Sequence, residues 1–443
     1  MTGRPIDWTV TEWDRIPREW SGVRLPNRLP EEDSPERAWL PLSMHLIEDR
    51  GVAQQPVFDP ALAHYSPAMR PSEPSFADPE TAECWRAARR EALDTVLNAV
   101  AQSDWAQHLV LRGVVPLRAW HGEDAREPHE LEFVVRPATR WTNDACTVRM
   151  LDDLAAAAER LSGPVRILAE GAVTDDLWMD NTRLPGRRLV LPWTAPGVPG
   201  GTVRLDFAFG ERLLDNRTLD DDRFVAARLV GGPQCGPLPD VTGPLATATP
   251  ALSLAWKILW LVTDARPQGH DLYDAVLLAR TVQVPYELLR EVFVRTYKGW
   301  AGCPLMPGHI AELDVDWEEF HKDYPDLVPC GDDFHSALGD LLEGTFGGHD
   351  DYTRRAAWLG PLVESMRPVL AENGMQRVQL LLAGRGMTME NILVTTRELL
   401  GCDLAKAHQA VHTHRGHSDF RTSELRAAAE RFAVVLGEPA AAL

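Results

Sequence analysis

Cysteine is sparse in this 443-residue chain, which has six scattered cysteines and no Cys-x-x-Cys pair. That scarcity argues against a disulfide framework and against a zinc site built on paired cysteines. No apolar run reaches the roughly 18 residues of a membrane span, and the longest candidate, residues 251–262, is interrupted by Lys257. The first 30 residues lack the compact apolar stretch and small-residue cleavage site of a signal peptide. We therefore expect a cytoplasmic protein with reduced thiols and no membrane partner.

Several common catalytic motifs are also missing. There is no G-x-x-x-x-G-K-[ST] loop and no G-x-S-x-G elbow, and His129-Glu130 lacks the second histidine of a zinc protease. Basic residues are fewer than acidic ones: the chain has 45 Lys and Arg and 65 Asp and Glu, which give a formal net charge of −20. This balance opposes delocalised binding to nucleic acid or to an anionic membrane. Only four of the basic residues are lysines, so Lys257 stands out in its apolar surroundings.

Composition divides the chain into four parts. Residues 1–80 hold 12 of the 34 prolines and predict an irregular arm. Residues 81–248 alternate between helical and strand patterns, which predicts a sheet domain, and helical patterns dominate residues 249–383. Gly384 and Gly386 then separate a small helical unit, residues 384–443. The alternation of helices and strands is typical of an α/β or an α+β domain, and the fold class predicted for the whole chain is α+β. Five aromatic side chains are expected to anchor the arm: Trp8, Trp13, Trp20, Trp39 and Phe58.

Hydrophobic periodicity predicts the individual elements. The helices expected before the last unit cover residues 79–100, 114–120, 143–161, 249–264, 271–281, 286–297, 317–324 and 352–373. The strands expected cover residues 109–111, 130–135, 165–169, 188–192 and 202–209. Thr249 followed by Pro250 is typical of a helix N-cap and first helical position.

Three acidic residues are expected to share one face of the sheet. In a strand, residues two apart point to the same side, so Glu130 and Glu132 project together. The same alternation puts Asp206 on the polar side of its strand. Three neighbouring carboxylates repel one another unless a divalent cation lies between them, and such a cation can hold nucleotide phosphates. The alternative interpretation is a solvated strand face.

A second polar group surrounds Lys257. Its ammonium lies in an otherwise apolar helical segment, so it must reach water or a carboxylate. Asp271 and Asp274 are three residues apart on the following predicted helix and share a face. Lys257 is therefore expected to lie near one of them, either to steer a phosphate or as a structural salt bridge between two helices.

The order of these motifs resembles the AbiEii/AbiGii-type nucleotidyltransferase toxin family over about residues 85–300. The motifs are Leu-Arg-Gly-x-x-x-Leu, then Arg-x-x-x-acid-Leu-acid-Phe, Leu-Asp-Phe, Leu-x-x-Lys and Asp-Leu-Tyr-Asp. The resemblance implies a nucleotidyltransferase fold with a helical C-terminal part. It also implies magnesium held by Glu130, Glu132 and Asp206. The further residues it implies are catalytic Lys257, Asp271 and Asp274 and nucleotide-binding Arg112, Gly113 and Arg126.

The implied activity is magnesium-dependent transfer of a nucleotidyl group from a nucleoside triphosphate to a transfer RNA or protein acceptor, as in a toxin. The sequence departs from the family pattern at four places. Val114 follows Gly113 where a second small residue is usual, Pro128 replaces a serine, both metal aspartates are glutamates, and His270 replaces a basic residue. The alternative is a catalytically degenerate fold that serves as a protein-binding module or scaffold.

The last unit contains a helix-turn-helix pattern. Residues 389–411 are apolar at helical spacing on both sides of Gly401. This segment is similar to the helix-turn-helix of the C-terminal domain of the bacterial ribosomal stalk protein. The similarity implies a protein partner that binds through residues 387–438, and the alternative is a stable α-hairpin without such a partner.

Overall fold

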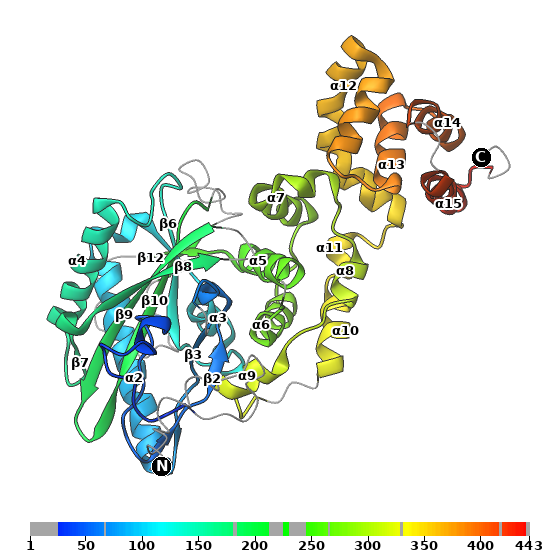
Figure 1. Ribbon diagram of the computed structural model, residues 1–443. Helices are drawn as coiled ribbons and strands as arrows, with labels where there is room; N and C mark the ends of the chain where they lie inside the picture. Colours follow the sequence, from blue (N-terminus) through cyan, green and yellow to red (C-terminus); the bar gives the residue numbers. More distant parts are fainter. Residues whose placement is uncertain are drawn as a thin grey trace, which may run out of the picture. The chain divides into compact units, whose positions relative to one another are not determined.

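The computed structural model describes residues 25–65, 68–179, 184–211, 225–229, 245–264, 266–327, 331–415 and 419–439 (Figure 1). The chain divides into two compact units, one of residues 1–282 and 314–334 and the other of residues 283–313 and 335–443. The chain crosses between the units after residues 282, 313 and 334, and the last of these crossings falls inside α10 (Gly331–Leu341). In this division, residues 249–282, which follow the predicted boundary at residue 248, belong to the same unit as the sheet, and the residues on both sides of the predicted boundary at residue 383 belong to the second unit.

A mixed eight-stranded sheet is the centre of the first unit. Its path runs β11-β12-β5-β6-β10-β9-β7, and β8 also pairs with β9. The pairs β12 with β5 and β10 with β6 are parallel, and the remaining pairs are antiparallel. The strands are β5 (Leu109–Arg112), β6 (Glu130–Val135), β7 (Arg166–Ile167), β8 (Val173–Met179), β9 (Leu184–Ala195), β10 (Val198–Ala208), β11 (Val225–Leu229) and β12 (Leu245–Ala248). This is the predicted α+β, nucleotidyltransferase-like fold.

One face of the sheet carries the main hydrophobic core. The helices α2 (Pro79–Gln102) and α4 (Ala145–Leu161) cover this face (Figure 1). They pack on alternate strand residues, which are fully buried: Leu131, Phe133, Val203, Leu205 and Phe207. Because the alternation of β6 and β10 gives these apolar residues to the core, their neighbours in the sequence face the opposite side.

Four further helices lie beyond the opposite, polar face. They are α3 (Val114–His121), α5 (Pro250–Thr263), α6 (Gly269–Ala279) and α9 (Trp317–Asp323). In Figure 1, α3, α5 and α6 lie on the side of the sheet away from α2 and α4. α5 begins as predicted, because the Thr249 side chain accepts a hydrogen bond from the Leu252 amide and Pro250 occupies the first turn.

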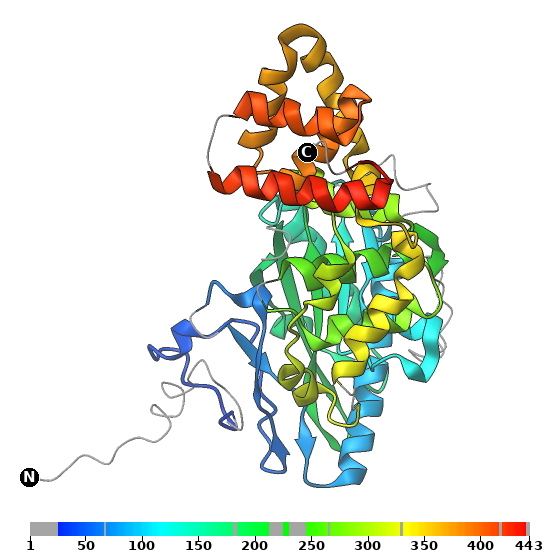
Figure 2. The same cartoon turned by 90° about the vertical axis from the view of Figure 1, so that its right-hand side faces the viewer.

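In the described residues 25–65 and 68–80, the N-terminal arm is irregular, as its composition predicts, and contains several short elements (Figure 2). Its short elements are η1 (Arg37–Trp39), β1 (Val52–Ala53), β2 (Pro56–Phe58), η2 (Pro60–Leu62), β3 (Met69–Pro71) and β4 (Ser75–Phe76). β1 pairs with β4 and β2 with β3. Phe58 packs against a small core, whereas Trp39 is 57% exposed and does not anchor the arm. Trp8, Trp13 and Trp20 lie outside the described residues.

The second unit is helical. It contains α7 (Tyr286–Thr296), η7 (Lys298–Gly302), α8 (Pro307–Ala311), α11 (Glu343–Phe346), α12 (Asp351–Gly384), α13 (Met389–Leu400), α14 (Leu404–Arg415) and α15 (Asp419–Leu436). The predicted helix, turn and helix around Gly401 is confirmed, and Gly401 ends α13 in a left-handed conformation. α13 also packs against α12, so residues 384–443 share a core with the helix that precedes them.

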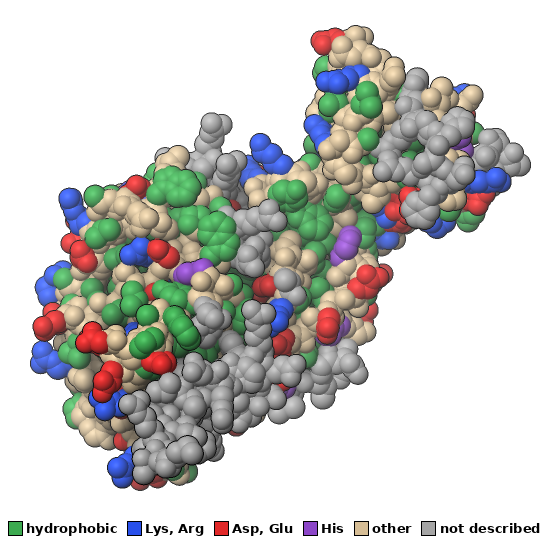
Figure 3. Space-filling view, in the orientation of Figure 1, with side chains coloured by type: hydrophobic (Ala, Val, Ile, Leu, Met, Phe, Trp, Pro, Cys, Tyr) green, Lys and Arg blue, Asp and Glu red, His purple; other side chains and the backbone are tan. Residues whose placement is uncertain are grey.

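No described helix is long and apolar enough to cross a membrane. On the face drawn in Figure 3, described Lys and Arg side chains are interspersed with Asp and Glu.

Candidate functional site

A polar cavity of about 150 Å³ lies in the first unit, on the face of the sheet opposite the main core. We call it the cleft. Its walls come from β6, β9 and β10, from α5, α6 and α9, and from the arm. Acidic side chains outnumber basic ones among its lining residues. The charged lining residues are Asp59, Arg70, Arg112, Glu130, Glu132, Arg188, Asp206, Glu211, Lys257, Asp264, Asp271, Glu319 and Asp323.

The three predicted acids share the face of the sheet that opens on the cleft. β10 runs parallel to β6 with Asp206 opposite Glu132, so the two carboxylates start from adjacent strands at the same level. Glu130 lies two residues before Glu132 on β6 and therefore projects from the same face of the sheet. The prediction that strand alternation aims these side chains to one side is confirmed.

The three acids do not, however, surround one point. Asp206 is bound in bidentate fashion by Arg188, with Nε to Oδ1 at 2.8 Å and Nη2 to Oδ2 at 2.7 Å. Arg204 lies 3.2 Å from Glu130, and Arg112 lies 3.5 Å from Glu132. Within the described ranges, no three His, Cys, Asp or Glu side chains form a group that could hold a metal ion. The sequence prediction of a shared ion is not met, because arginines neutralise the acids instead.

Burial and these partners set the protonation of the acids. Burial raises the pKa of Asp206 and of Glu132, and the nearby Glu130 charge raises the pKa of both further. Burial acts in the same direction on Glu130, but the charges of Arg204 and Arg188 outweigh it and lower its pKa.

Gly113 brings the backbone close to Glu132. It is the N-cap of α3 with φ at +79°, and a Cβ built there would lie 2.2 Å from Oε1 of Glu132. A side chain at position 113 would therefore displace the carboxylate. The adjacent Arg112 lies over the rings of Trp256 and Trp260, with its guanidinium carbon 5.5 and 5.0 Å from their centroids.

Lys257 is buried in α5 and contacts both predicted partners. Its Nζ lies 2.7 Å from Asp271 Oδ1 and 2.9 Å from Asp274 Oδ2, which confirms the expected contact. Burial opposes its charge, but these two carboxylates raise its pKa overall. Lys257 and Asp271 line the cleft, whereas Asp274 lies behind them and is fully buried.

Arg126 is placed behind the cleft as well. It holds Asp274 through two hydrogen bonds of 2.9 Å and donates a third, of 2.7 Å, to the Tyr324 hydroxyl. Its guanidinium and the ammonium of Lys257 overcome the burial of Asp274 and lower its pKa. Arg126 and Asp274 are absent from the cleft lining, so the structure gives them a supporting position.

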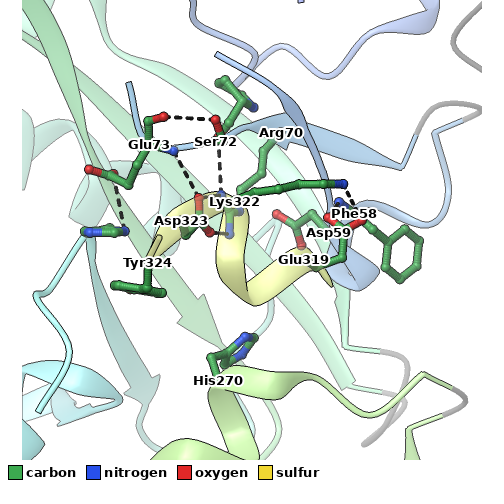
Figure 4. A network of polar contacts seen from close by, with 12 residues as sticks. Phe58, Asp59, Arg70, Ser72, Glu73, His270, Glu319, Lys322, Asp323 and Tyr324 are labelled. Carbon is green, nitrogen blue, oxygen red and sulfur yellow. Dashed lines mark hydrogen bonds and ion pairs between the residues drawn. The ribbon is translucent and has the colours of Figure 1, made fainter. Parts of the chain in front are cut away.

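The arm supplies cleft residues that the sequence did not reveal. Asp59 accepts a hydrogen bond of 2.8 Å from Nη1 of Arg188. Arg70 pairs with Asp323 of α9, and Asp323 also accepts from the Glu73 amide at 3.0 Å (Figure 4). No motif in the proline-rich arm pointed to these residues. The only usable signal was the presence of charged residues among prolines, which is too common to identify a site.

Other contacts in Figure 4 bind the arm to α9. Glu319 accepts a hydrogen bond of 2.8 Å from the Phe58 amide. Lys322 donates to the Pro56 carbonyl at 3.1 Å and pairs with Glu319 at 2.7 Å. The arm is thus a wall of the cleft, held by backbone groups as well as by side chains.

Comparison with known families identifies a match over residues 95–341 to the family described as Nucleotidyl transferase AbiEii toxin, Type IV TA system. Among curated proteins, none matches the sequence. The family match ends before α13, so it gives no support to the similarity between the α13–α14 hairpin and the ribosomal stalk protein.

Proposed function

The chain belongs to the AbiEii nucleotidyl transferase toxin family, and from that membership we propose that its cleft binds a nucleoside triphosphate and transfers the nucleotidyl group to an RNA or protein acceptor. One observation carries the proposal. Glu130, Glu132 and Asp206 rise from two parallel strands into a cavity that Lys257 also lines. Carboxylates and a cation gathered in a recessed polar site can position and activate the groups of a phosphoryl-type transfer.

In the proposed transfer, an acceptor hydroxyl attacks the α-phosphorus and pyrophosphate leaves. We assign the proton of that hydroxyl to Glu132, because burial raises the pKa of this carboxylate toward the range of an effective base. Lys257 and Arg112 line the cleft and supply positive charge for the phosphate oxygens. Asp271 orients Lys257, and Arg126 supports that pair through Asp274.

Magnesium on the three acids, which the resemblance implied, does not fit this arrangement. Both oxygens of Asp206 are engaged by Arg188, and each glutamate has its own arginine. The proposed transfer therefore uses only side chains of the chain. We propose that magnesium enters as the counter-ion of the triphosphate substrate. The surplus of acids in the cleft supports this, since a bare triphosphate would meet net repulsion there.

The direct test is to incubate the full chain with each α-labelled nucleoside triphosphate, magnesium, transfer RNA and candidate proteins. Label on an acceptor supports the proposal, and Glu132→Gln should reduce it by about a hundredfold, the usual scale of general-base catalysis. The control is Asp176→Asn, which removes an exposed carboxylate paired with Arg187. Equal labelling by Glu132→Gln and the wild type would contradict the assignment of Glu132.

A second function is favoured by two observations. Val114, directly after Gly113, is 2% exposed and occupies the place where a small residue would let phosphate approach. The acids are neutralised by arginines. Together they favour a degenerate nucleotidyltransferase fold that acts as a binding module. Triphosphate binding without label transfer to any acceptor would support this second function.

The toxin–antitoxin family also implies a protein partner. We propose that such a partner binds through residues 387–438, where α15 exposes Val434 (81%) and Val435 (44%). Val434→Glu should weaken a captured complex without changing nucleotide binding. An unchanged complex would contradict the proposed surface.

A further inference from the structure

Each acid on the cleft face of the sheet has an arginine directly across from it on a neighbouring strand. Glu130 faces Arg204 of β10, and Glu132 faces Arg112 of β5. Asp206 faces Arg188 of β9. Opposite side chains on paired strands start only about 5 Å apart. The pairing is therefore fixed by the register of the backbone and does not depend on chance side-chain rotamers.

Arg188 is the most constrained of the three arginines. Its side chain is 3% exposed, and all three of its hydrogen bonds to carboxylates are 2.8 Å or shorter. Two of them hold Asp206 from the sheet, and the third holds Asp59 from the arm. The guanidinium thus joins two carboxylates from distant parts of the chain, as a shared metal ion would.

We propose that Arg188 replaces the divalent cation that the fold family would place at Glu130, Glu132 and Asp206. A guanidinium that engages both oxygens of a carboxylate occupies one lone pair on each and fixes the direction of the carboxylate, and its positive charge repels a divalent cation nearby. The three acids consequently bind no divalent ion of their own. Substitution of Arg188 by a neutral residue creates the site.

The inference rests on the proposed function only for the choice of these acids, and its test needs no nucleotide. Free Mn²⁺ is measured by electron paramagnetic resonance while the full-length protein is titrated. Arg188→Gln should bind Mn²⁺ at least about tenfold more tightly than the wild type, because it frees Asp206 and removes a repelling charge. Arg188→Lys keeps the charge but loses the two-point contact with Asp206, so its Mn²⁺ affinity should lie between those of the wild type and Arg188→Gln.

Arg70→Gln is the matched control. It removes the same charge from the same cleft, but the Arg70 side chain pairs directly with Asp323 and acts on Glu130 only through its charge. Its Mn²⁺ affinity should stay within about twofold of the wild type if the effect depends on contact rather than on general charge. An equal gain in Arg70→Gln and Arg188→Gln would overturn the proposal.

Two further measurements keep the inference testable if Arg188→Gln does not fold, as circular dichroism would reveal. The first is Mn²⁺ binding by the wild type, which should be as weak as that of Asp206→Asn. Weaker binding by Asp206→Asn than by the wild type would show that the acids already hold an ion, and so would refute the inference. The second is the labelling assay with triphosphate. Its failure would contradict the proposed transfer and leave the Mn²⁺ result unaffected.

Discussion

His129 is a base that burial keeps neutral, although its Nδ1 lies 3.2 Å from Oε1 of Glu73. Its side chain is 8% exposed, and its ring stacks on Tyr324 with centroids 4.7 Å apart. Burial lowers its pKa well below the ordinary value, and the charges of Arg89 and Arg126 add to this effect. The folded state therefore excludes a proton that the unfolded state binds below a pH of about 6.5.

We expect the free energy of unfolding to fall as the pH decreases below about 6.5, by up to ~1.4 kcal/mol per pH unit for this group. His129→Gln should give a shallower slope between pH 6.5 and 5 in urea unfolding, because it removes the proton uptake. His64→Gln, at an exposed position in the arm, serves as the control and should keep the wild-type slope. Parallel slopes for wild type and His129→Gln would contradict the expectation.

Gly113 provides a second prediction for a single residue. Gly113→Ala places a Cβ where the Glu132 carboxylate lies, and it also forces a positive φ on alanine. Gly197→Ala imposes a similar φ of +78° in open space. Both should lose about 1 to 2 kcal/mol of stability from backbone strain. Only Gly113→Ala should also reduce the rate of label transfer to the acceptor, by at least about tenfold, because Glu132 is displaced.

Thermal unfolding and the labelling assay measure the two effects separately. A labelling rate in Gly113→Ala equal to that of Gly197→Ala would show that the position of Glu132 does not matter.

Among the structural elements, the arm and α9 form a contact that closes one side of the cleft. Asp323 is central to it, because it binds both the Arg70 side chain and the Glu73 amide. The charge of Arg70 overcomes the burial of Asp323 and lowers its pKa. Removal of one partner from a buried ion pair leaves the other charge without compensation.

We therefore expect Asp323→Asn to lower the free energy of unfolding by about 2 to 4 kcal/mol. Limited proteolysis should also cut residues 41–78 faster, because the arm loses its attachment to α9. Asp326→Asn, at an exposed position three residues away, should change neither quantity. Equal protection of the arm in Asp323→Asn and the wild type would show that the remaining contacts hold it alone.

For the whole molecule, the division into two units predicts how truncation acts. Val378 and Leu382 of α12 are fully buried, and Asn391 of α13 donates to the Gly302 carbonyl at 3.0 Å. Removal of the residues after Leu382 would expose this apolar surface, so the second unit should lose stability.

Hydrogen exchange should show that truncation destabilises the second unit and leaves the first unit unchanged. In a chain ending at Leu382, amides of α12 should lose protection while those of β6 and β10 keep it. Lost protection throughout the sheet would show that the last helices complete the core of the first unit. A chain truncated after Asn373 serves as the comparison for the chain ending at Leu382. It ends just before Gly374, where a φ of +74° already interrupts α12.

The features that could be predicted from the sequence are local ones. The period of two in β6 and β10 determined that Glu130, Glu132 and Asp206 share a face, because side-chain direction alternates along any strand. Likewise, Lys257 in an apolar helix had to reach water or a carboxylate, and the structure shows that it contacts Asp271 and Asp274. Helices with a clear apolar stripe and cap, such as α2 and α5, began where predicted. The short strands β8 and β12 were missed, because four to seven residues carry little periodic signal.

The partners of the three acids depend on the tertiary structure. The arginine opposite each acid depends on the register between strands, and no single strand's pattern encodes that register. The arm joined the cleft through pairs such as Phe58 and Glu319, which are 261 positions apart. Contacts at that separation follow from how the whole chain closes on itself. The register between the strands, in turn, placed an arginine against each acid where the sequence alone predicted a metal ion.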